Sequence, residues 1–151
     1  MITAAHIKQL AQKHSKSIVD IRHHLHQNPE LSFEEYNTQK YVLQQLHNMG
    51  ITDVTPLANT GLVALIKGKN PDSKTIALRG DMDALPIEEQ NDVPYKSVNT
   101  GVMHACGHDV HTSCLLGAAQ ILNELKTEFE GTIKLVFQPG EEKLPGGASL
   151  M

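Results

Sequence analysis

Two short apolar runs, separated by one long stretch of helical spacing, constrain the fold of this chain more than any other feature. Residues 75–78 and 132–137 consist mainly of aliphatic and β-branched residues and are typical of strands, the second of them largely buried. Residues 109–126 carry apolar side chains at three-to-four spacing, and Asp109 is suited to cap the N-terminus of that helix. This order predicts a βαβ unit, and hence an α/β fold with a mixed, largely parallel sheet flanked by helices.

The first third of the chain predicts two further helices. Residues 4–27 repeat apolar side chains at helical spacing and stop at Asn28-Pro29. The tetrapeptide 32–35, Ser-Phe-Glu-Glu, has the pattern of a capping box, and it predicts a second helix that continues to Gly50.

A further strand is predicted at residues 62–66, where five apolar residues stand in a row. The turn-rich residues 68–72 separate this run from residues 75–78. The pattern favours two strands joined by a hairpin-like loop.

Composition excludes several classes of function. With 13 Lys+Arg against 17 Asp+Glu the formal net charge is −4, so no nucleic-acid partner is expected. Hydrophobic residues make up 40% and charged residues 20%, as in globular proteins, and no stretch reaches the roughly 18 apolar residues of a membrane span. The chain lacks the apolar segment of a signal peptide near its start and has only two cysteines, so a cytoplasmic protein without a membrane partner or a disulfide framework is expected.

Three polar clusters stand at the ends of predicted elements. Asp81 and Asp83 follow one strand, residues 104–109 (His-Ala-Cys-Gly-His-Asp) precede a helix, and Glu141 and Glu142 follow the last strand. If the two strands are parallel neighbours, their carboxyl ends lie at the same edge of the sheet, and all three clusters converge there. Thiolate, imidazole and carboxylate ligands together suit a borderline-soft divalent ion such as Zn²⁺ or Mn²⁺.

Each cluster taken alone also has a simpler interpretation. The Asp-x-Asp sequence fits a solvated turn, the two adjacent glutamates fit surface charge, and Cys106 fits a small buried apolar residue. The histidines of the first helix fit its solvated face or its C-terminal end, where the helix dipole stabilises a positively charged imidazolium group. This interpretation covers His6, His14, His23, His24 and His26, and His47 in the second helix is taken as solvated too. The joint occurrence at three element ends favours the metal site.

Four segments in order resemble the signature segments of the M20 metallopeptidase family. They are residues 22–31, 78–87, 103–109 and 137–142, which read RHHLHQNPEL, LRGDMDALPI, MHACGHD and FQPGEE. Within that family the chain is most similar to the amidohydrolases, which include N-acyl-L-amino acid amidohydrolase and hippurate hydrolase. The segments span nearly the whole chain, so the resemblance is not confined to one motif.

The resemblance implies a catalytic α/β domain with a two-metal centre, interrupted by a smaller dimerisation domain. Family members run beyond twice this length, so residues 1–151 are expected to be the N-terminal part of the catalytic domain. The dimerisation domain, the C-terminal part and the downstream histidines that complete the metal site would lie outside it. The implied reaction is hydrolysis of an N-acyl amino acid to a carboxylic acid and an amino acid, with two Mn or Zn ions, in a homo-oligomer.

The resemblance also assigns roles to individual residues. It implies three metal ligands, Cys106, His108 and Glu142. Glu141 is expected to be the general base that takes a proton from water, and Asp83 matches an aspartate that assists catalysis beside the metals. Asp81 stands where the wider family usually has a histidine ligand, and it is left out of the expected ligand set.

Two alternatives remain open at this stage. The first is a non-catalytic structural zinc site with four ligands, Cys106, His104, His108 and His111, which would leave Glu141 and Glu142 without a role. The second is a truncated product that is only partly folded, because a sheet cut before its last strands exposes an edge and apolar faces.

Overall fold

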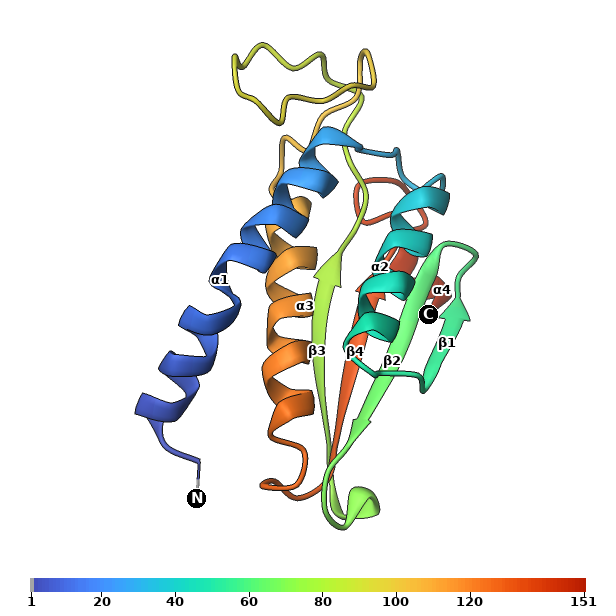
Figure 1. Cartoon of the computed structure of the whole chain (residues 1–151). Coiled ribbons are helices and arrows are strands. Elements are labelled where there is room, and N and C mark those ends of the chain that lie inside the picture. The colour runs from blue at the N-terminus through green and yellow to red at the C-terminus, as the bar shows by residue number, and fades with distance from the viewer. Residues whose placement is uncertain (1) are drawn as a thin grey trace.

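One mixed sheet of four strands carries three helices on a single face. The computed structural model describes residues 2–151. Figure 1 shows the elements in chain order: α1 (Ala4–Gln27), α2 (Tyr36–Asn48), β1 (Val54–Leu57), β2 (Gly61–Lys67), the 3₁₀ turn η1 (Pro71–Ser73), β3 (Thr75–Asp81), α3 (His108–Glu124), β4 (Thr132–Gln138) and α4 (Gly147–Leu150). The expected α/β class with a mixed sheet is therefore confirmed.

The strand order is β1-β2-β4-β3. Strands β3 and β4 are parallel, in a register that pairs Thr75 with Thr132 and Asp81 with Gln138, and α3 connects them as the predicted βαβ crossover. The expected hairpin between β2 and β3 is wrong, because β4 lies between them and pairs antiparallel with β2. The two inner strands, β2 and β4, are the most deeply buried, and Leu62 in β2 and Leu135 and Phe137 in β4 are completely buried.

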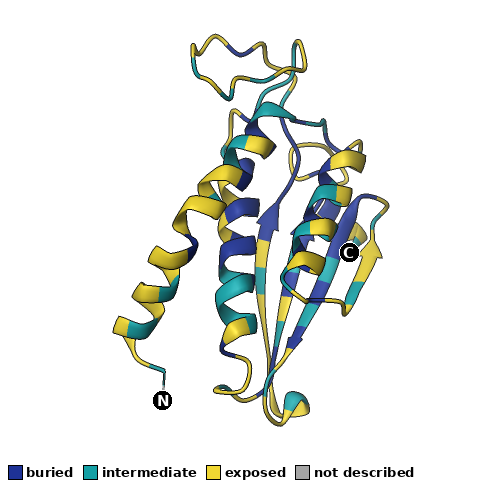
Figure 2. Cartoon of the chain, in the orientation of Figure 1, coloured by how far each residue is buried: buried dark blue, intermediate teal, exposed yellow. Residues whose placement is uncertain are grey.

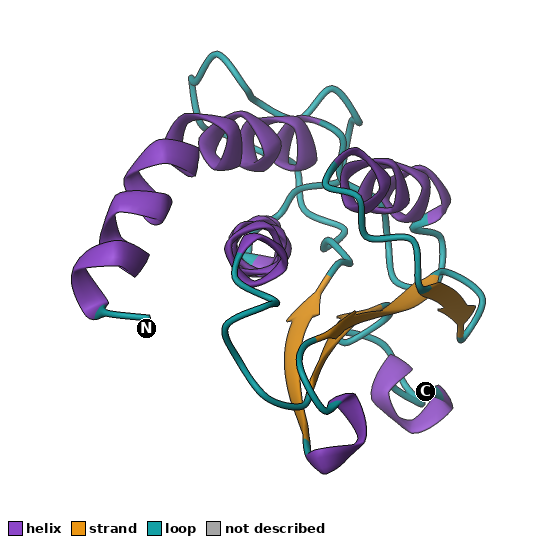
Figure 3. Ribbon diagram, turned by 60° about the horizontal axis from the view of Figure 1, so that its bottom comes forward, coloured by secondary structure: helices purple, strands orange, loops and turns teal. Residues whose placement is uncertain are grey.

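The hydrophobic core lies between the sheet and the helices. Figure 2 shows the buried residues concentrated where α2 and α3 face β2, β3 and β4. Helix α1 packs on α3 at Gly117, where an added Cβ would stand 3.1 Å from the side chain of Ile18. Figure 3 shows that the opposite face of the sheet is covered only near β1 and β2, by α4, and Ile76 on the edge strand β3 is 51% exposed.

Both predicted helix caps differ from the structure. Helix α2 starts at Tyr36, and the capping box is wrong because the Ser32 hydroxyl donates to the carboxylate of Asp83 at 2.6 Å. The carboxylate of Glu30 accepts the amide of Thr38 instead, at 2.7 Å. Helix α3 begins at His108 after Gly107, so Asp109 lies in the first turn and not at the cap.

The histidines of α1 are more engaged than the sequence predicted. His14 is buried and lies 2.7 Å from Glu124, so its assignment as a solvated residue is wrong. His26 is buried between two carboxylates, with Nδ1 2.7 Å from Asp109 and Nε2 3.0 Å from Glu89. This pairing ties the loop that follows β3 to the first turn of α3. None of the helices in residues 2–151 is long and apolar enough to cross a membrane.

Candidate metal centre

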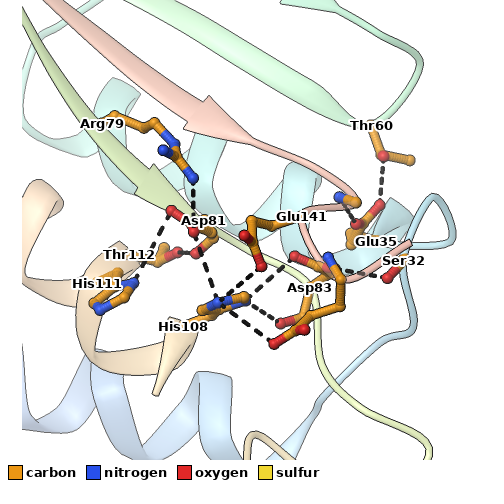
Figure 4. Close-up of polar contacts among 12 residues, drawn as sticks. Ser32, Glu35, Thr60, Arg79, Asp81, Asp83, His108, His111, Thr112 and Glu141 are labelled. Atoms are coloured by element: carbon orange, nitrogen blue, oxygen red, sulfur yellow. Dashed lines mark hydrogen bonds and ion pairs between the residues drawn. The ribbon is translucent and has the colours of Figure 1, made fainter. Parts of the chain in front are cut away.

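The three polar clusters meet at one edge of the sheet. Strand β3 ends at Asp81, α3 begins at His108, and Glu141 follows β4 in the next turn. Because β3 and β4 are parallel and in register to their last residues, their carboxyl ends lie side by side. Figure 4 shows the side chains from these elements pointing toward one another around the imidazole of His108.

His108 is at the centre of the cluster. Its Nε2 lies 3.6 Å from Oδ2 of Asp81, 3.9 Å from Oε2 of Glu141 and 3.9 Å from Oε1 of Glu142. One donor atom each from Cys106, His108 and Glu142 lies within 4.8 Å of the other two. The structure therefore brings together the residues that the sequence analysis placed in one site.

Asp83 holds two members of this cluster, His108 and Glu142, in position. Its main-chain oxygen lies 2.9 Å from Nδ1 of His108, and its Oδ2 accepts from the Ser32 hydroxyl at 2.6 Å and from the Glu142 amide at 3.0 Å. Burial opposes ionisation of Asp83, but its hydrogen bonds, with His108 first, hold its pKa far below the usual value. The same carboxylate raises the pKa of His108 to about 9 against the effect of burial.

Cys106 is exposed in the loop before α3. A hydrogen bond with the Glu142 carboxylate raises the pKa of its thiol, and burial and the neighbouring carboxylates act in the same direction. A cation between these groups would offset the field of the carboxylates and favour the thiolate. The donor set is thus one whose negative charge a divalent ion could balance.

A second group of possible ligands shares His108. Donor atoms of Asp81, His108 and His111 also lie within 4.8 Å of one another. Asp81 is held from two sides, because Arg79 donates to its Oδ2 at 3.0 Å and Thr112 donates to its main-chain oxygen at 2.7 Å. Asp81, which the sequence analysis left out of the ligand set, therefore lies at the site.

The four-ligand structural zinc site is not formed. Within residues 2–151, neither group of potential ligands includes His104. This imidazole is buried, neither ring nitrogen has a hydrogen-bond partner among the described residues, and burial lowers its pKa to about 4. A structural site would require His104 to share an ion with Cys106.

Sequence reasoning missed the polar residues that support the site. The Glu35 carboxylate accepts from the Gly140 amide at 2.7 Å and from the Thr60 hydroxyl, and Ser32 donates to Asp83. Glu35 and Ser32 precede α2, far from the site in sequence, and the pattern of these residues fitted a helix cap. No periodicity or spacing could have connected them with the end of β4.

Comparison with known proteins gives one family match and many relatives. The model of peptidase family M20/M25/M40 matches residues 77–151. The N-acyl-L-amino acid amidohydrolase of Geobacillus stearothermophilus is 42% identical over 150 residues, which are 99% of this chain and 40% of that protein. The N-acetyl-L-cysteine deacetylase of Bacillus subtilis is 46% identical over 136 residues, which are 90% of this chain and 32% of that protein.

Solved structures agree with the sequence relatives. A Bacillus subtilis protein described as a dinuclear metal binding peptidase from the M20 family superposes with a TM-score of 0.82 at 40% identity, over 89% of this chain and 38% of that chain. A putative aminohydrolase from methicillin-resistant Staphylococcus aureus gives 0.88 at 41% identity, over 95% of this chain and 38% of that chain. The chain thus spans about two fifths or less of the length of these proteins.

Proposed function

We propose, from the premise that this chain belongs to peptidase family M20/M25/M40, that its site hydrolyses the amide bond of N-acyl amino acids with the help of divalent metal ions. One observation carries the proposal. Cys106, His108 and Glu142 offer three donor atoms within 4.8 Å of one another, and the adjacent Glu141 lies beside them. Ligands next to a spare carboxylate are what a hydrolytic site requires, whereas a structural site has no use for a free base.

The donor set fits the metals expected from the family resemblance. Thiolate, imidazole and carboxylate together suit Zn²⁺ or Mn²⁺. The main-chain oxygen of Asp83 lies against Nδ1 of His108, which leaves Nε2 to face the carboxylates as a ligand. We assign Cys106, His108 and Glu142 as ligands, and Asp81 and His111 lie close enough to contribute.

Glu141 is the proposed general base. Its side chain is 41% exposed, against 25% for Glu142 and 3% for His108, so it is the most accessible of these groups to water and substrate. Metal ions, when bound, supply Lewis acidity that makes water more acidic and polarises a carbonyl group. The Glu141 carboxylate then removes a proton from water as the water oxygen attacks the amide carbon, and it returns the proton to the leaving amine nitrogen.

Asp83 is proposed to position the ligands. It holds the His108 ring through its main-chain oxygen and the Glu142 backbone through its carboxylate, so one residue orients two of the three proposed ligands. Partners of this kind fix the orientation and raise the basicity of a ligating imidazole. Asp83 thereby assists catalysis without contacting the substrate.

The substrate class follows from the relatives. Two of them are named for the hydrolysis of N-acyl-L-amino acids and of N-acetyl-L-cysteine. We propose that this chain is the N-terminal part of a longer catalytic domain, which supplies the remaining ligands and assembles as a homo-oligomer. The open outer edge of β3 and the exposed Ile76 on that strand support a sheet that continues past β3.

The test uses the protein expressed from the complete reading frame. It is stripped with a chelator, reloaded with Mn²⁺ or Zn²⁺, and offered N-acetyl-L-amino acids and, as controls, the matching dipeptides, with release of free amine as the readout. We expect hydrolysis of the N-acyl substrates only after metal is returned. Equal rates with and without metal, or no turnover of any N-acyl amino acid, would overturn the proposal.

A further inference from the structure

The turn that carries Glu141 and Glu142 is held from a distant part of the chain. This turn comprises residues 139–142 and directly follows β4. Figure 4 shows Glu35, from the loop between α1 and α2, beside this turn and close to Thr60. Its position calls for an explanation, since a glutamate that begins a surface helix is usually solvated.

Glu35 is completely buried and fully engaged. Its exposed fraction is 0%, and so is that of Thr60. The Gly140 amide donates to Oε1 of Glu35 at 2.7 Å, and the Thr60 hydroxyl donates to Oε2 at 2.5 Å. Each carboxylate oxygen thus has one protein donor, and the side chain links the start of α2, the start of β2 and the turn.

The backbone next to the contact between Glu35 and Gly140 has an unusual conformation on both sides. Phe33 has a φ of 67°, which is uncommon for a residue with a side chain. Its ring lies against Gly140, where an added Cβ would overlap it, and Gly140 itself has a φ of 52°. The carbonyl oxygen of Gly140 accepts from the Gly147 amide at 2.9 Å. Both main-chain polar groups of Gly140 are therefore fixed.

Burying the carboxyl group of Glu35 lowers the stability of the folded chain unless another effect offsets the cost. Burial raises the pKa of Glu35, so the charged form is disfavoured despite its hydrogen bonds. Among residues 2–151 no Lys, Arg or His side chain within 4.0 Å forms an ion pair with it. Replacing a buried polar group together with its hydrogen-bond partners by apolar groups of the same shape can be nearly neutral for folding. The contact with Gly140 therefore calls for a role beyond packing.

We propose that Glu35 is a positioning residue that clamps the turn at Gly140 and so sets the direction of Glu141 and Glu142. This inference rests on the proposed function, in which Glu141 is the base and Glu142 a ligand. The turn is gripped at its start by Glu35 and at its end by Asp83, whose Oδ2 accepts the Glu142 amide at 3.0 Å. Glu141 lies between the two anchored amides.

Loss of the clamp is expected to lower turnover more than substrate binding. A displacement of a catalytic group by about 1 Å can cost about 100-fold in rate. Glu35→Ala removes the acceptor for both Gly140 and Thr60, so we expect kcat to fall about 10–100-fold with little change in KM. Glu35→Gln keeps an oxygen for the Gly140 amide and can donate to the Thr60 hydroxyl, so it should rescue most of the activity.

The structural readout is amide hydrogen exchange of Gly140 and Glu142, followed by NMR in the 151-residue chain. We expect exchange at Gly140 to rise about tenfold or more in Glu35→Ala and to stay near the wild-type rate in Glu35→Gln. The matched control is Val42→Ala, which truncates a completely buried side chain in α2, the helix that follows Glu35. It should lower the free energy of global unfolding. The exchange rate of the Gly140 amide, relative to the rates of the other amides in the same variant, should stay unchanged.

A second variant covers the case in which Glu35→Ala does not fold. Thr60→Val keeps the shape of the side chain and removes only the donor to Oε2, and it should raise Gly140 exchange by a smaller factor. The proposal is overturned if the Glu35 and Thr60 variants exchange at Gly140 like Val42→Ala, or if Glu35→Gln behaves like Glu35→Ala. Hydrogen exchange needs neither metal nor substrate. It therefore tests whether Glu35 holds the Gly140 amide even if the complete protein hydrolyses no N-acyl amino acid.

Discussion

The imidazole of His108 donates from Nδ1 to the main-chain oxygen of Asp83, at 2.9 Å. A carbonyl oxygen only accepts, so this contact places a proton on Nδ1 and directs Nε2 toward the carboxylates of Asp81, Glu141 and Glu142. Asp83, just after β3, thus leaves Nε2 as the ring nitrogen that a metal ion would use.

The two cysteines form a matched pair for testing thiolate ligation. Cys106 and Cys114 are both exposed and free, but only Cys106 belongs to a group of potential ligands. Cobalt added to the chain should produce a thiolate-to-metal charge-transfer band in the wild type and in Cys114→Ala, and not in Cys106→Ala. A band that persists in Cys106→Ala would remove the thiol from the ligand set.

Removing the hydrogen bonds through which Asp83 holds the proposed ligands should reduce metal affinity without removing a ligand. Ser32→Ala deletes the 2.6 Å hydrogen bond to Asp83, and Asp83→Ala also frees the Glu142 amide. Loss of such supporting contacts typically costs about 10–100-fold in metal affinity, so we expect a small effect for Ser32→Ala and one in that range for Asp83→Ala. Calorimetric titration with Zn²⁺ measures both. Unchanged affinity in Asp83→Ala would contradict the positioning role.

Acid should destabilise the chain partly through Glu89. Burial opposes ionisation of this carboxyl group, but hydrogen bonds from Ser97, His26 and Asn91 lower its pKa from 4.5 to about 2. A lowered pKa in the folded state means that the stabilisation is present above pH 4.5 and is lost as the pH falls toward 2. Glu89→Gln should therefore flatten the decline of the unfolding free energy across this window.

The control for this measurement is Glu34→Gln, which changes an exposed glutamate in the loop before α2. It should leave the acid limb as in the wild type. Denaturant unfolding at a series of pH values gives the comparison, and an identical slope for Glu89→Gln and the wild type would show that Glu89 does not contribute.

The 151-residue chain by itself should bind metal weakly and be inactive. It offers Cys106, His108 and Glu142 as ligands of the family type. A two-metal centre needs about two or three protein ligands for each ion, so water would have to complete the coordination. Incubation with excess Mn²⁺ or Zn²⁺ and an N-acyl amino acid tests this. Turnover at ordinary enzymatic rates that Cys106→Ala abolishes would show that this chain suffices.

Local patterns predicted the elements of the fold better than their pairing. The spacing of apolar residues located α1 and α3, and the βαβ order indicated a parallel relation between β3 and β4, which the structure shows to be neighbours. The antiparallel pairing of β2 with β4 depends on contacts between Leu62 and Phe137, which are distant in sequence, so the turn at residues 68–72 suggested a hairpin instead. Strand β1 escaped notice because it has only four residues and contains Pro56.

The site was predictable to the extent that its residues lie at element ends. Asp81, His108 and Glu141 converge because parallel strands end together, which sequence order can reveal. The supports were not predictable, because Ser32 and Glu35 act on residues 51 and 105 positions away. A similarly large separation in sequence explains the error at His14, whose partner Glu124 lies on α3, 110 positions away.

The two adjacent glutamates have different proposed roles, Glu141 as the general base and Glu142 as a metal ligand. In the protein expressed from the complete reading frame, Glu141→Gln should lower kcat by about 10²–10⁴-fold with metal content near that of the wild type. Glu142→Gln should lose metal, because it replaces an anionic carboxylate, whose Oε1 lies 3.9 Å from Nε2 of His108, by a neutral amide. Metal content and kcat measured on this pair of variants give the most direct test. Loss of metal in Glu141→Gln together with retained metal in Glu142→Gln would contradict the assignment.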